Sequence, residues 1–127
     1  MKATLIDTQG PWLEATLKTD FGTLVDMDEF SIDERSTPSV GSEFDVNLST
    51  TLVEDESWEA VFSSNPTKKK GIENIKGWPY RAFGEVTSID PVTVDCGFIE
   101  VTEVFHTKDS RVIGEYVGFT ISSLEAS

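Results

Sequence analysis

Cys96 and His106 are the one cysteine and the one histidine of the 127-residue chain, and they stand ten positions apart. A thiolate activated by a histidine is a common catalytic nucleophile, so the two residues raise the question of an active site. Val92, Val94 and Cys96 alternate with polar residues, which predicts that the thiol lies on the apolar face of a strand. Burial among valines, with acids nearby in the sequence, disfavours the thiolate. We therefore predict a structural cysteine and a protein without enzymatic activity.

The alternation around Cys96 changes phase at Gly97, because Ile99 and Val101 are the apolar residues after it. A glycine at a phase change is typical of a β-bulge, which bends a strand at the corner of a barrel. His106 follows in the polar stretch "FHTKDSR" and is predicted to lie in the turn after this strand. The prediction is one bent strand followed by a histidine in a polar turn.

Asp26, Asp28 and Glu29 are close enough in the sequence to suggest a site for a divalent cation. The Asp-x-[Asp/Asn]-x-[Asp/Asn]-Gly spacing of a calcium loop is absent from this stretch, however. Val25 and Met27 alternate with the two aspartates, which predicts Asp26 and Asp28 on the solvent-facing side of a strand. No metal and no other cofactor is predicted.

Period-two alternation of apolar and polar residues dominates the chain and predicts short, half-buried strands. The clearest segments are 42–52 and 115–121, and weaker ones cover 2–7, 12–19, 22–30 and 80–89. Gly, Pro and Asp turns between them are typical of a small antiparallel β-barrel. The predicted fold is therefore mainly β, a barrel of six to seven strands in a single domain over residues 1–127. A loose similarity between residues 1–53 and 80–124 leaves an internal duplication open.

One segment departs from the strand pattern. A tryptophan, a valine and a phenylalanine lie at helical spacing within "EDESWEAVFSSNP", with acids before them and Asn-Pro at the end. This predicts one short helix around residues 55–64, with Ser57 or Asp55 as its N-cap and Trp58 holding it to the barrel. Residues 67–78 are predicted to be an exposed connection with one helical turn.

Charge is the most distinctive bulk property, because 23 acidic residues against 10 basic ones give a net charge of −13. Residues 1–60 hold 14 of the acids and three of the bases, notably in "DMDEFSIDER" and "EDESWE". Such a field repels nucleic acid phosphates and anionic membranes, and it speeds the encounter with a basic partner. Solubility explains the same acidity, and the sequence leaves that alternative open.

The sequence also bears on the compartment. The start of the chain shows no secretory signal, and no apolar run approaches the roughly 18 residues that span a bilayer. A single cysteine excludes a disulfide framework within the chain. A cytoplasmic protein without a membrane partner is therefore expected.

The second part of the chain resembles a group of small bacterial proteins that carry no assigned activity. The shared pattern, over about residues 57–124, is W-x-x-x-F-x-x-N-P, then G-W-x-Y, V-D-C-G and I-G-E-Y-V. The order of strands and helix also resembles the OB-fold, a five-stranded partly open barrel. The resemblance implies an OB-like barrel and brings no catalytic residue with it.

These observations favour a protein-binding module with a basic protein partner. In size, charge and barrel character the chain is similar, as a class, to the immunity proteins of polymorphic toxin systems, which cover the active sites of basic nuclease toxins. The predicted binding residues are steering acids and an aromatic anchor: Asp26, Asp28, Glu29, Asp33, Glu34, Glu54, Asp55, Glu56, Trp12 and Phe30. Trp12 falls on the polar side of its predicted strand, so it either covers a barrel rim or anchors the interface.

Two other classes of function remain. A barrel that holds a small ligand or forms a homo-oligomer is the alternative, with the acidity serving solubility. Binding of single-stranded nucleic acid is disfavoured, because it needs a basic groove. The basic residues of this chain form only one cluster in the sequence, at residues 68–70 and 76. Salt separates the classes, because a steered acidic interface weakens with ionic strength and apolar ligand binding barely responds.

Overall fold

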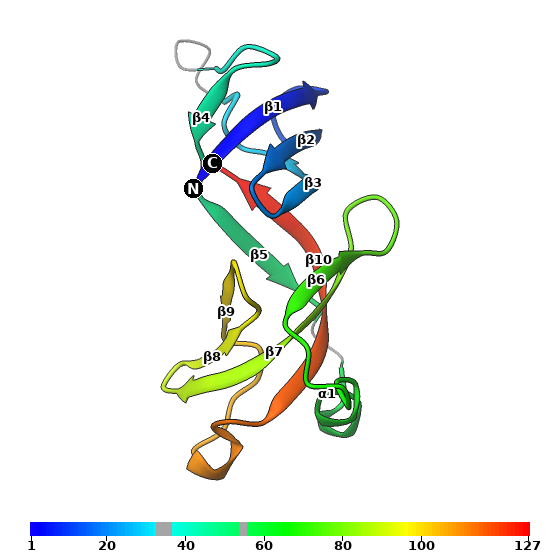
Figure 1. The fold of residues 1–127 in the computed structure, drawn as a ribbon, viewed down its shortest axis with the longest axis vertical. Coiled ribbons are helices and arrows are strands. Elements are labelled where there is room, and N and C mark those ends of the chain that lie inside the picture. The colour runs from blue at the N-terminus through cyan, green and yellow to red at the C-terminus, as the bar shows by residue number, and fades with distance from the viewer. Residues whose placement is uncertain (33–36, 54–55) are drawn as a thin grey trace. The chain divides into compact units, whose positions relative to one another are not determined.

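The computed structural model describes residues 1–32, 37–53 and 56–127, and this part of the chain is mainly β. It contains ten strands, one α-helix and one 3₁₀-helix (Figure 1). The prediction of a mainly β chain with one short helix is confirmed. Within the same described residues, no helix is both long and apolar enough to cross a membrane.

The chain divides into two compact units, which are described separately. Unit 1 comprises Met1–Thr51, Asn74–Pro79 and Ser122–Ser127, and unit 2 comprises Leu52–Glu73 and Tyr80–Ile121. Strand β10 (Tyr116–Ala126) contributes its first half to unit 2 and its second half to unit 1.

Unit 1 is built on three neighbouring antiparallel strands (Figure 1). The strands of this unit besides the end of β10 are β1 (Lys2–Thr8), β2 (Glu14–Thr19), β3 (Gly22–Asp28), β4 (Glu43–Asp45) and most of β5 (Leu48–Leu52). Strand β1 pairs with β4 on its other side, and β3 runs parallel to the end of β10. The sheet is therefore mixed, whereas an all-antiparallel sheet was predicted. The parallel pair is possible because a long stretch of chain, not a hairpin, joins its two strands.

Strands of unit 1 enclose an apolar core on one face. Its buried members are Ala3, Leu5, Leu17, Val46 and Ala126, and Phe30, Phe44 and Leu48 pack against them. The predicted strand over residues 42–52 is divided into β4 and β5 at this core. Between these two strands, Val46 N donates to Met1 O, and Asn47 exchanges two backbone hydrogen bonds with Ser127. The backbone of this break is therefore hydrogen-bonded to Met1 and Ser127.

Unit 2 is an antiparallel sheet with α1 (Trp58–Ser63) beside it (Figure 1). Its strands besides β10 are β6 (Gly71–Asn74), β7 (Tyr80–Ile89), β8 (Val92–Asp95) and β9 (Glu100–Thr102), and the 3₁₀-helix is Ser110–Val112. Strand β7 has the bounds predicted from the alternation. Strand β6 pairs with β7, so the prediction of a helical turn in this connection is wrong. The structure has more strands than the six to seven predicted for two reasons. Two predicted strands are each divided in two, into β4 and β5 and into β8 and β9, and β6 was not predicted.

Cys96 and Gly97 lie in a tight turn between β8 and β9. Cys96 N donates to Ile99 O at 2.9 Å, and Asp95 pairs with Glu100 across the hairpin. Gly97 has a φ of 97°, a conformation that glycine adopts readily. The predicted bulge at Gly97 is therefore wrong: the chain reverses here, which changes the apolar phase just as a bulge does.

Candidate functional site

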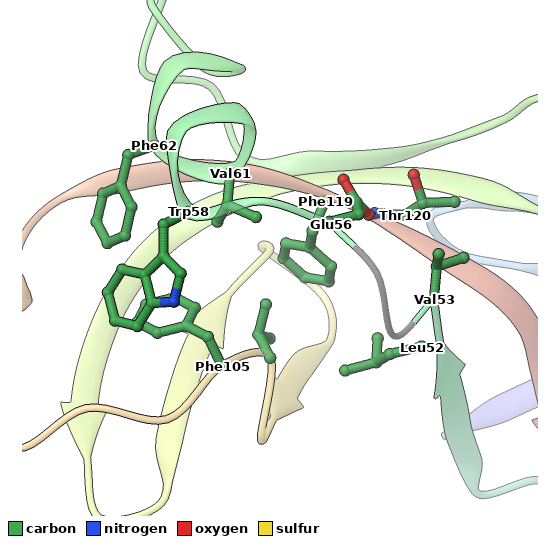
Figure 2. Close-up of a pocket in the computed structure, with 10 residues that line it drawn as sticks. Leu52, Val53, Glu56, Trp58, Val61, Phe62, Phe105, Phe119 and Thr120 are labelled. Atoms are coloured by element: carbon green, nitrogen blue, oxygen red, sulfur yellow. The ribbon is translucent and has the colours of Figure 1, made fainter.

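Three aromatic side chains gather in unit 2, and we call Trp58, Phe62 and Phe105 the aromatic cluster (Figure 2). The rings of Trp58 and Phe62 stack, with 5.7 Å between their centroids and 14° between their planes. The ring of Phe105 tilts against both, with its centroid 5.0 Å from that of Trp58 and 5.4 Å from that of Phe62. These separations are typical of favourable aromatic pairs, so the three rings support one another.

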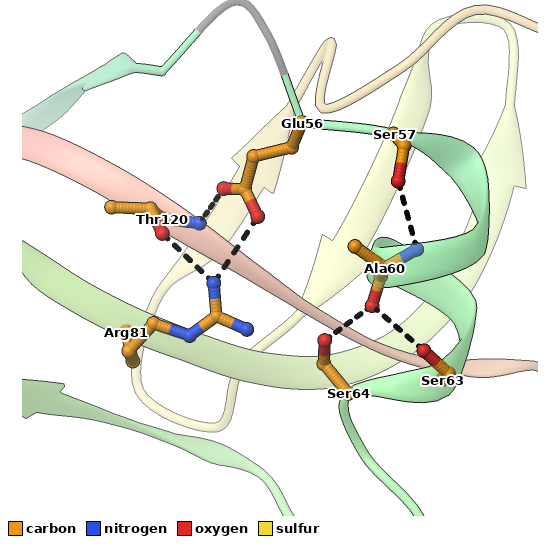
Figure 3. Close-up of polar contacts among 7 residues, drawn as sticks. All are labelled: Glu56, Ser57, Ala60, Ser63, Ser64, Arg81 and Thr120. Carbon is orange, nitrogen blue, oxygen red and sulfur yellow. Dashed lines mark hydrogen bonds and ion pairs between the residues drawn. The ribbon is translucent and has the colours of Figure 1, made fainter.

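Helix α1 positions two of these rings, because Trp58 and Phe62 are four residues apart and lie on one face. The helix begins at a predicted N-cap, where Ser57 Oγ accepts a hydrogen bond from Ala60 N at 3.2 Å (Figure 3). A six-residue helix is not stable alone in water, so tertiary packing holds it. Val61 is the buried residue of α1, whereas Trp58, the predicted anchor, keeps 48% of its surface exposed.

The side chain of Glu56 ties the start of α1 to β10 (Figure 3). One carboxylate oxygen accepts a hydrogen bond from Thr120 N, and the other lies 3.1 Å from Arg81 Nη1. Arg81 Nη1 also donates to Thr120 Oγ1 at 2.8 Å. The carboxylate therefore satisfies a backbone N–H of β10, and a charge-assisted pair holds it in place.

The end of α1 is fixed to the same strand. Asn65 Nδ2 donates to Val117 O at 3.3 Å and to Lys69 O at 2.8 Å. Gly118 permits close approach, because a Cβ atom there would lie only 2.7 Å from Ser64 Cβ. Both flanks of α1 are thus attached to β10, and this attachment fixes the position of the aromatic cluster.

The aromatic cluster lines one side of a cavity of about 50 Å³ (Figure 2). Beyond the cluster itself, its lining is Leu52, Val53, Glu56, Val61, Val104, Phe119 and Thr120. Pockets that enclose drug-sized ligands measure roughly 300–1,000 Å³, so this cavity has room for little more than water. The aromatic cluster is therefore suited to contact another molecule at the surface and not to enclose a ligand.

Acidic residues are shared between the units. Unit 1 has 11 acids and 4 bases, and unit 2 has 12 acids and 6 bases, so their net charges are −7 and −6. The acidic first half of the sequence therefore does not correspond to one acidic unit. Glu59, in the first turn of α1, is an exposed acid beside Trp58 in the sequence.

Asp26 and Asp28 are both fully buried, so their predicted position on the solvent-facing side of the strand is wrong. The register pairs Asp26 with Ala15, which places the aspartate on the core side of β3. Asp28 is satisfied there by Thr8 and Ser31, which donate to it. Neither aspartate has a surface to offer a partner.

The remaining predicted binding residues have different positions. Phe30 packs on Phe44, with 5.0 Å between ring centroids, and belongs to the core; Glu29 is half-buried. Trp12 is 55% exposed and lies in the turn before β2, not in the strand, and its backbone N–H donates to Asp28 O at 2.7 Å. Asp33, Glu34, Glu54 and Asp55 lie outside the described residues.

Cys96 is fully buried, as predicted. Burial, and then the charge of Asp95, raise the pKa of the thiol to about 12, which keeps it protonated at neutral pH. His106 is exposed and lines a shallow hollow of about 710 Å³ with Asp90, Glu103 and Lys108, among others.

Several residues of the site were missed from the sequence. The four-residue spacing of Trp58 and Phe62 was available as a signal that both rings share a helix face. Phe105 and Arg81 had no such signal, because they reach the site from distant segments. No protein-family model, curated protein or solved structure matches this chain.

Proposed function

We propose that this chain is a non-enzymatic, acidic protein-binding module that engages a basic protein through the aromatic cluster. The observation that carries the proposal is the half-exposed ring of Trp58, held in a packed cluster on a unit of net charge −6. Tryptophan is enriched among the residues that contribute most to protein interfaces. Acids around such an anchor raise the association rate with a basic partner.

Chemistry of the cluster favours arginine or lysine on the partner. The face of an indole attracts a cation through its quadrupole, and a guanidinium also stacks on it. Glu59 supplies a charge on the same helix, while Glu56 is committed to Arg81 at 3.1 Å. We therefore assign the anchor to Trp58 and the nearby exposed charge to Glu59. Trp12, exposed on unit 1, is the second candidate anchor.

By class, the proposed partner is a basic toxin such as a nuclease, and the module would act as its immunity protein. The acidity of both units supports this extension, because a nuclease presents a basic surface to nucleic acid. An OB-like barrel, a single domain, an internal duplication, the resemblance to small bacterial proteins and a cytoplasmic location stay predictions.

Affinity capture with three matched baits tests the proposal. Wild-type, Trp58→Ala and Trp12→Ala proteins are immobilised at equal density, exposed to lysate of the source organism and eluted with a salt gradient. The two tryptophans have similar exposure, so Trp12→Ala controls for the loss of any exposed indole. We expect a basic protein in stoichiometric amount on wild type and on Trp12→Ala, released by rising salt, and little on Trp58→Ala.

The captured protein is then purified, and its association rate is measured between 50 and 500 mM salt. A steep fall with salt and inhibition of a nuclease activity would support the immunity role. Equal capture on Trp58→Ala, or loss on Trp12→Ala alone, would contradict the assignment to the aromatic cluster. A bait that captures only further copies of this protein would favour the homo-oligomer.

A small-ligand function is the second candidate, favoured by the hollow beside His106. Its volume of about 710 Å³ lies in the range of ligand sites. The hollow is lined by the β7–β8 turn at Asp90 and by the segment that carries Glu103 and Lys108. A thermal-shift screen with small molecules, repeated on His106→Ala, separates this function from protein binding.

Nucleic acid binding receives no support from the lysines near α1. Lys69 Nζ lies 3.0 Å from Glu73 Oε1, and Lys70 Nζ lies 2.8 Å from Asp95 Oδ2. These acids compete with phosphate for both cations, so the segment is a poor site for a phosphate backbone.

A further inference from the structure

The register of unit 1 brings two carboxyl groups to the core side of β3. Asp26 pairs with Ala15, and Leu24 pairs with Leu17, so the aspartate points to the same side as core residues. Asp28 is two residues further on and shares this side. Both aspartates have no exposed surface.

The hydrogen bonding of these two carboxyl groups is unequal. Asp28 Oδ1 accepts from Ser31 N at 2.8 Å, and Asp28 Oδ2 accepts from Ser31 Oγ at 2.7 Å and from Thr8 Oγ1. Asp26 Oδ1 and Oδ2 are both buried and have no hydrogen-bond partner among the residues that the structure describes. Three donors stabilise the charge of Asp28, whereas none of the described residues donates a hydrogen bond to Asp26.

Other charged groups of these strands lie on the opposite side of the sheet. On β2, Glu14 pairs with Met27 and Lys18 with Thr23; on β10, Glu125 also pairs with Met27. On β1, Asp7 pairs with Thr16, and it too lies away from Asp26. Glu125 is further occupied by hydrogen bonds from its neighbours. Asp28 is therefore the charged group that faces Asp26 from the described strands.

With no donor among the described residues, Asp26 is better suited to carry a proton, which removes its charge, than to bind a metal ion. A divalent cation takes six or more oxygen ligands, whereas Asp28 already has three donors on its two oxygens. No group of three or more acids, histidines or cysteines that suits a metal occurs in the described part of the chain. Burial, and then the charge of Asp28, raise the pKa of Asp26 to about 8, in agreement with a neutral side chain.

We propose that Asp26 is a proton-dependent switch for the stability of unit 1, which is held by the neutral carboxyl and weakened when the carboxyl ionises beside Asp28. The folded state keeps the Asp26 proton up to about pH 8, whereas the unfolded chain loses it near the ordinary value of 3.8. The stabilisation that neutral Asp26 contributes to the folded state is therefore fully present below pH 3.8 and is lost as the pH rises toward 8. The device acts on unit 1, and the aromatic cluster of unit 2 is not part of it.

Urea unfolding at pH 5, 6, 7 and 8 tests the switch with wild type, Asp26→Asn and Asp26→Val. Asparagine keeps the shape of the aspartate side chain, and valine removes its polar atoms and is favoured in β-strands. If one variant does not fold, the other still tests the proposal. We expect the folded-to-unfolded ratio of wild type, relative to either variant, to fall about tenfold per pH unit between pH 5 and 7 and less steeply between pH 7 and 8, near the raised pKa. The carboxyl ¹³C resonance of Asp26 should titrate in the same range.

Parallel pH profiles of wild type and both variants would overturn the proposal, since Asp26 would then bind no proton upon folding. Asp45→Asn is the matched control, because Asp45 is an exposed acid of unit 1 that pairs with Lys2. Its profile should match that of wild type. A rise in wild-type stability with added Mg²⁺ or Ca²⁺ at pH 8, absent from Asp26→Val, would also overturn the proposal and assign a cation to this position.

Discussion

Glu56 in unit 2 and Asp26 in unit 1 are both carboxyl groups withdrawn from water, and they differ in their partners. The side chain of Glu56 is 19% exposed, lies 3.1 Å from Arg81 Nη1 and accepts a hydrogen bond from Thr120 N. Asp26 is 0% exposed, lacks a hydrogen-bond partner among the described residues and lies near a second acid. Burial alone therefore does not determine what a carboxyl group does in this protein; the neighbouring donors do.

The difference has a structural consequence in each unit. In unit 2 the paired carboxylate joins α1 to β10, and so it fixes the surface that we propose for binding. In unit 1 the carboxyl group of Asp26 has no hydrogen-bond partner among the described residues, and its burial favours a proton. The position of the Glu56 carboxylate depends on its ion pair with Arg81, so Arg81 is the residue to remove first.

Arg81→Met is expected to lower the unfolding free energy by about 3 kcal/mol, the largest of these effects. Methionine keeps the aliphatic length, but it leaves Glu56 without its cation and Thr120 Oγ1 without a donor. Urea unfolding at pH 7, followed by tryptophan fluorescence, measures the change. Since α1 depends on this joint, part of the fluorescence of the three tryptophans should change before global unfolding.

Arg111→Met is the matched control for that substitution. Arg111 also pairs with an acid, Asp109, at 2.7 Å, but its side chain is 89% exposed. Exposed ion pairs contribute little, so no measurable loss is expected. Equal losses of unfolding free energy in the two variants would show that burial does not strengthen the ion pair of Glu56 with Arg81.

Sequence alternation located the strands but did not show which side of β3 faces the core. Val25 and Met27 are apolar, so the pattern assigned them to the core and Asp26 to solvent. In the structure Val25 and Met27 are half-buried, and the two aspartates occupy the more buried side of β3. Asp28 is tolerated there because Ser31 and Thr8 supply donors, and nothing in a period-two pattern encodes donors from other segments.

Cys96 and the helix show what was predictable from local pattern. The burial of Cys96 followed from two valines in phase, and the cap at Ser57 followed from side-chain chemistry beside the helix. Gly97 was ambiguous, because a bulge and a hairpin turn both favour glycine and both change the phase. Glu56 and Arg81 are 25 residues apart, so their pairing depended on the fold and had no local signal.

Asp28→Asn is expected to lower the unfolding free energy by about 2 kcal/mol at pH 6. The amide keeps one acceptor oxygen but turns an NH₂ group toward the donors of Ser31 or Thr8, so at least one hydrogen bond is lost. The pKa of Asp26 should also fall toward its usual value, because the charge of Asp28 is one of the two causes that raise it. Urea unfolding measures the first effect, and the carboxyl titration of Asp26 measures the second. An unchanged titration would separate the two aspartates and contradict their coupling.

Cys96→Ala is expected to lower the unfolding free energy by about 1 kcal/mol, the smallest effect apart from the control at Arg111, because it removes one buried sulfur atom and leaves a small cavity. Cys96 is a useful comparison for Asp26, because both are buried acidic groups but their pKa values lie in different pH ranges. Burial and the charge of Asp95 raise the pKa of the thiol from 9.0 to about 12. The unfolded chain therefore releases the thiol proton above pH 9, where the folded state keeps it, and this stabilisation is complete below pH 9 and lost between pH 9 and 12.

The difference in unfolding free energy between wild type and Cys96→Ala should consequently be constant from pH 5 to 8. Over the same range the difference for Asp26→Val should change steadily, because the raised pKa of Asp26 lies near 8 and that of Cys96 near 12. Urea unfolding of both variants in one buffer series makes the comparison direct. Rapid reaction of native Cys96 with a thiol reagent at pH 8 would contradict its burial, and the flat profile would then lose its physical basis.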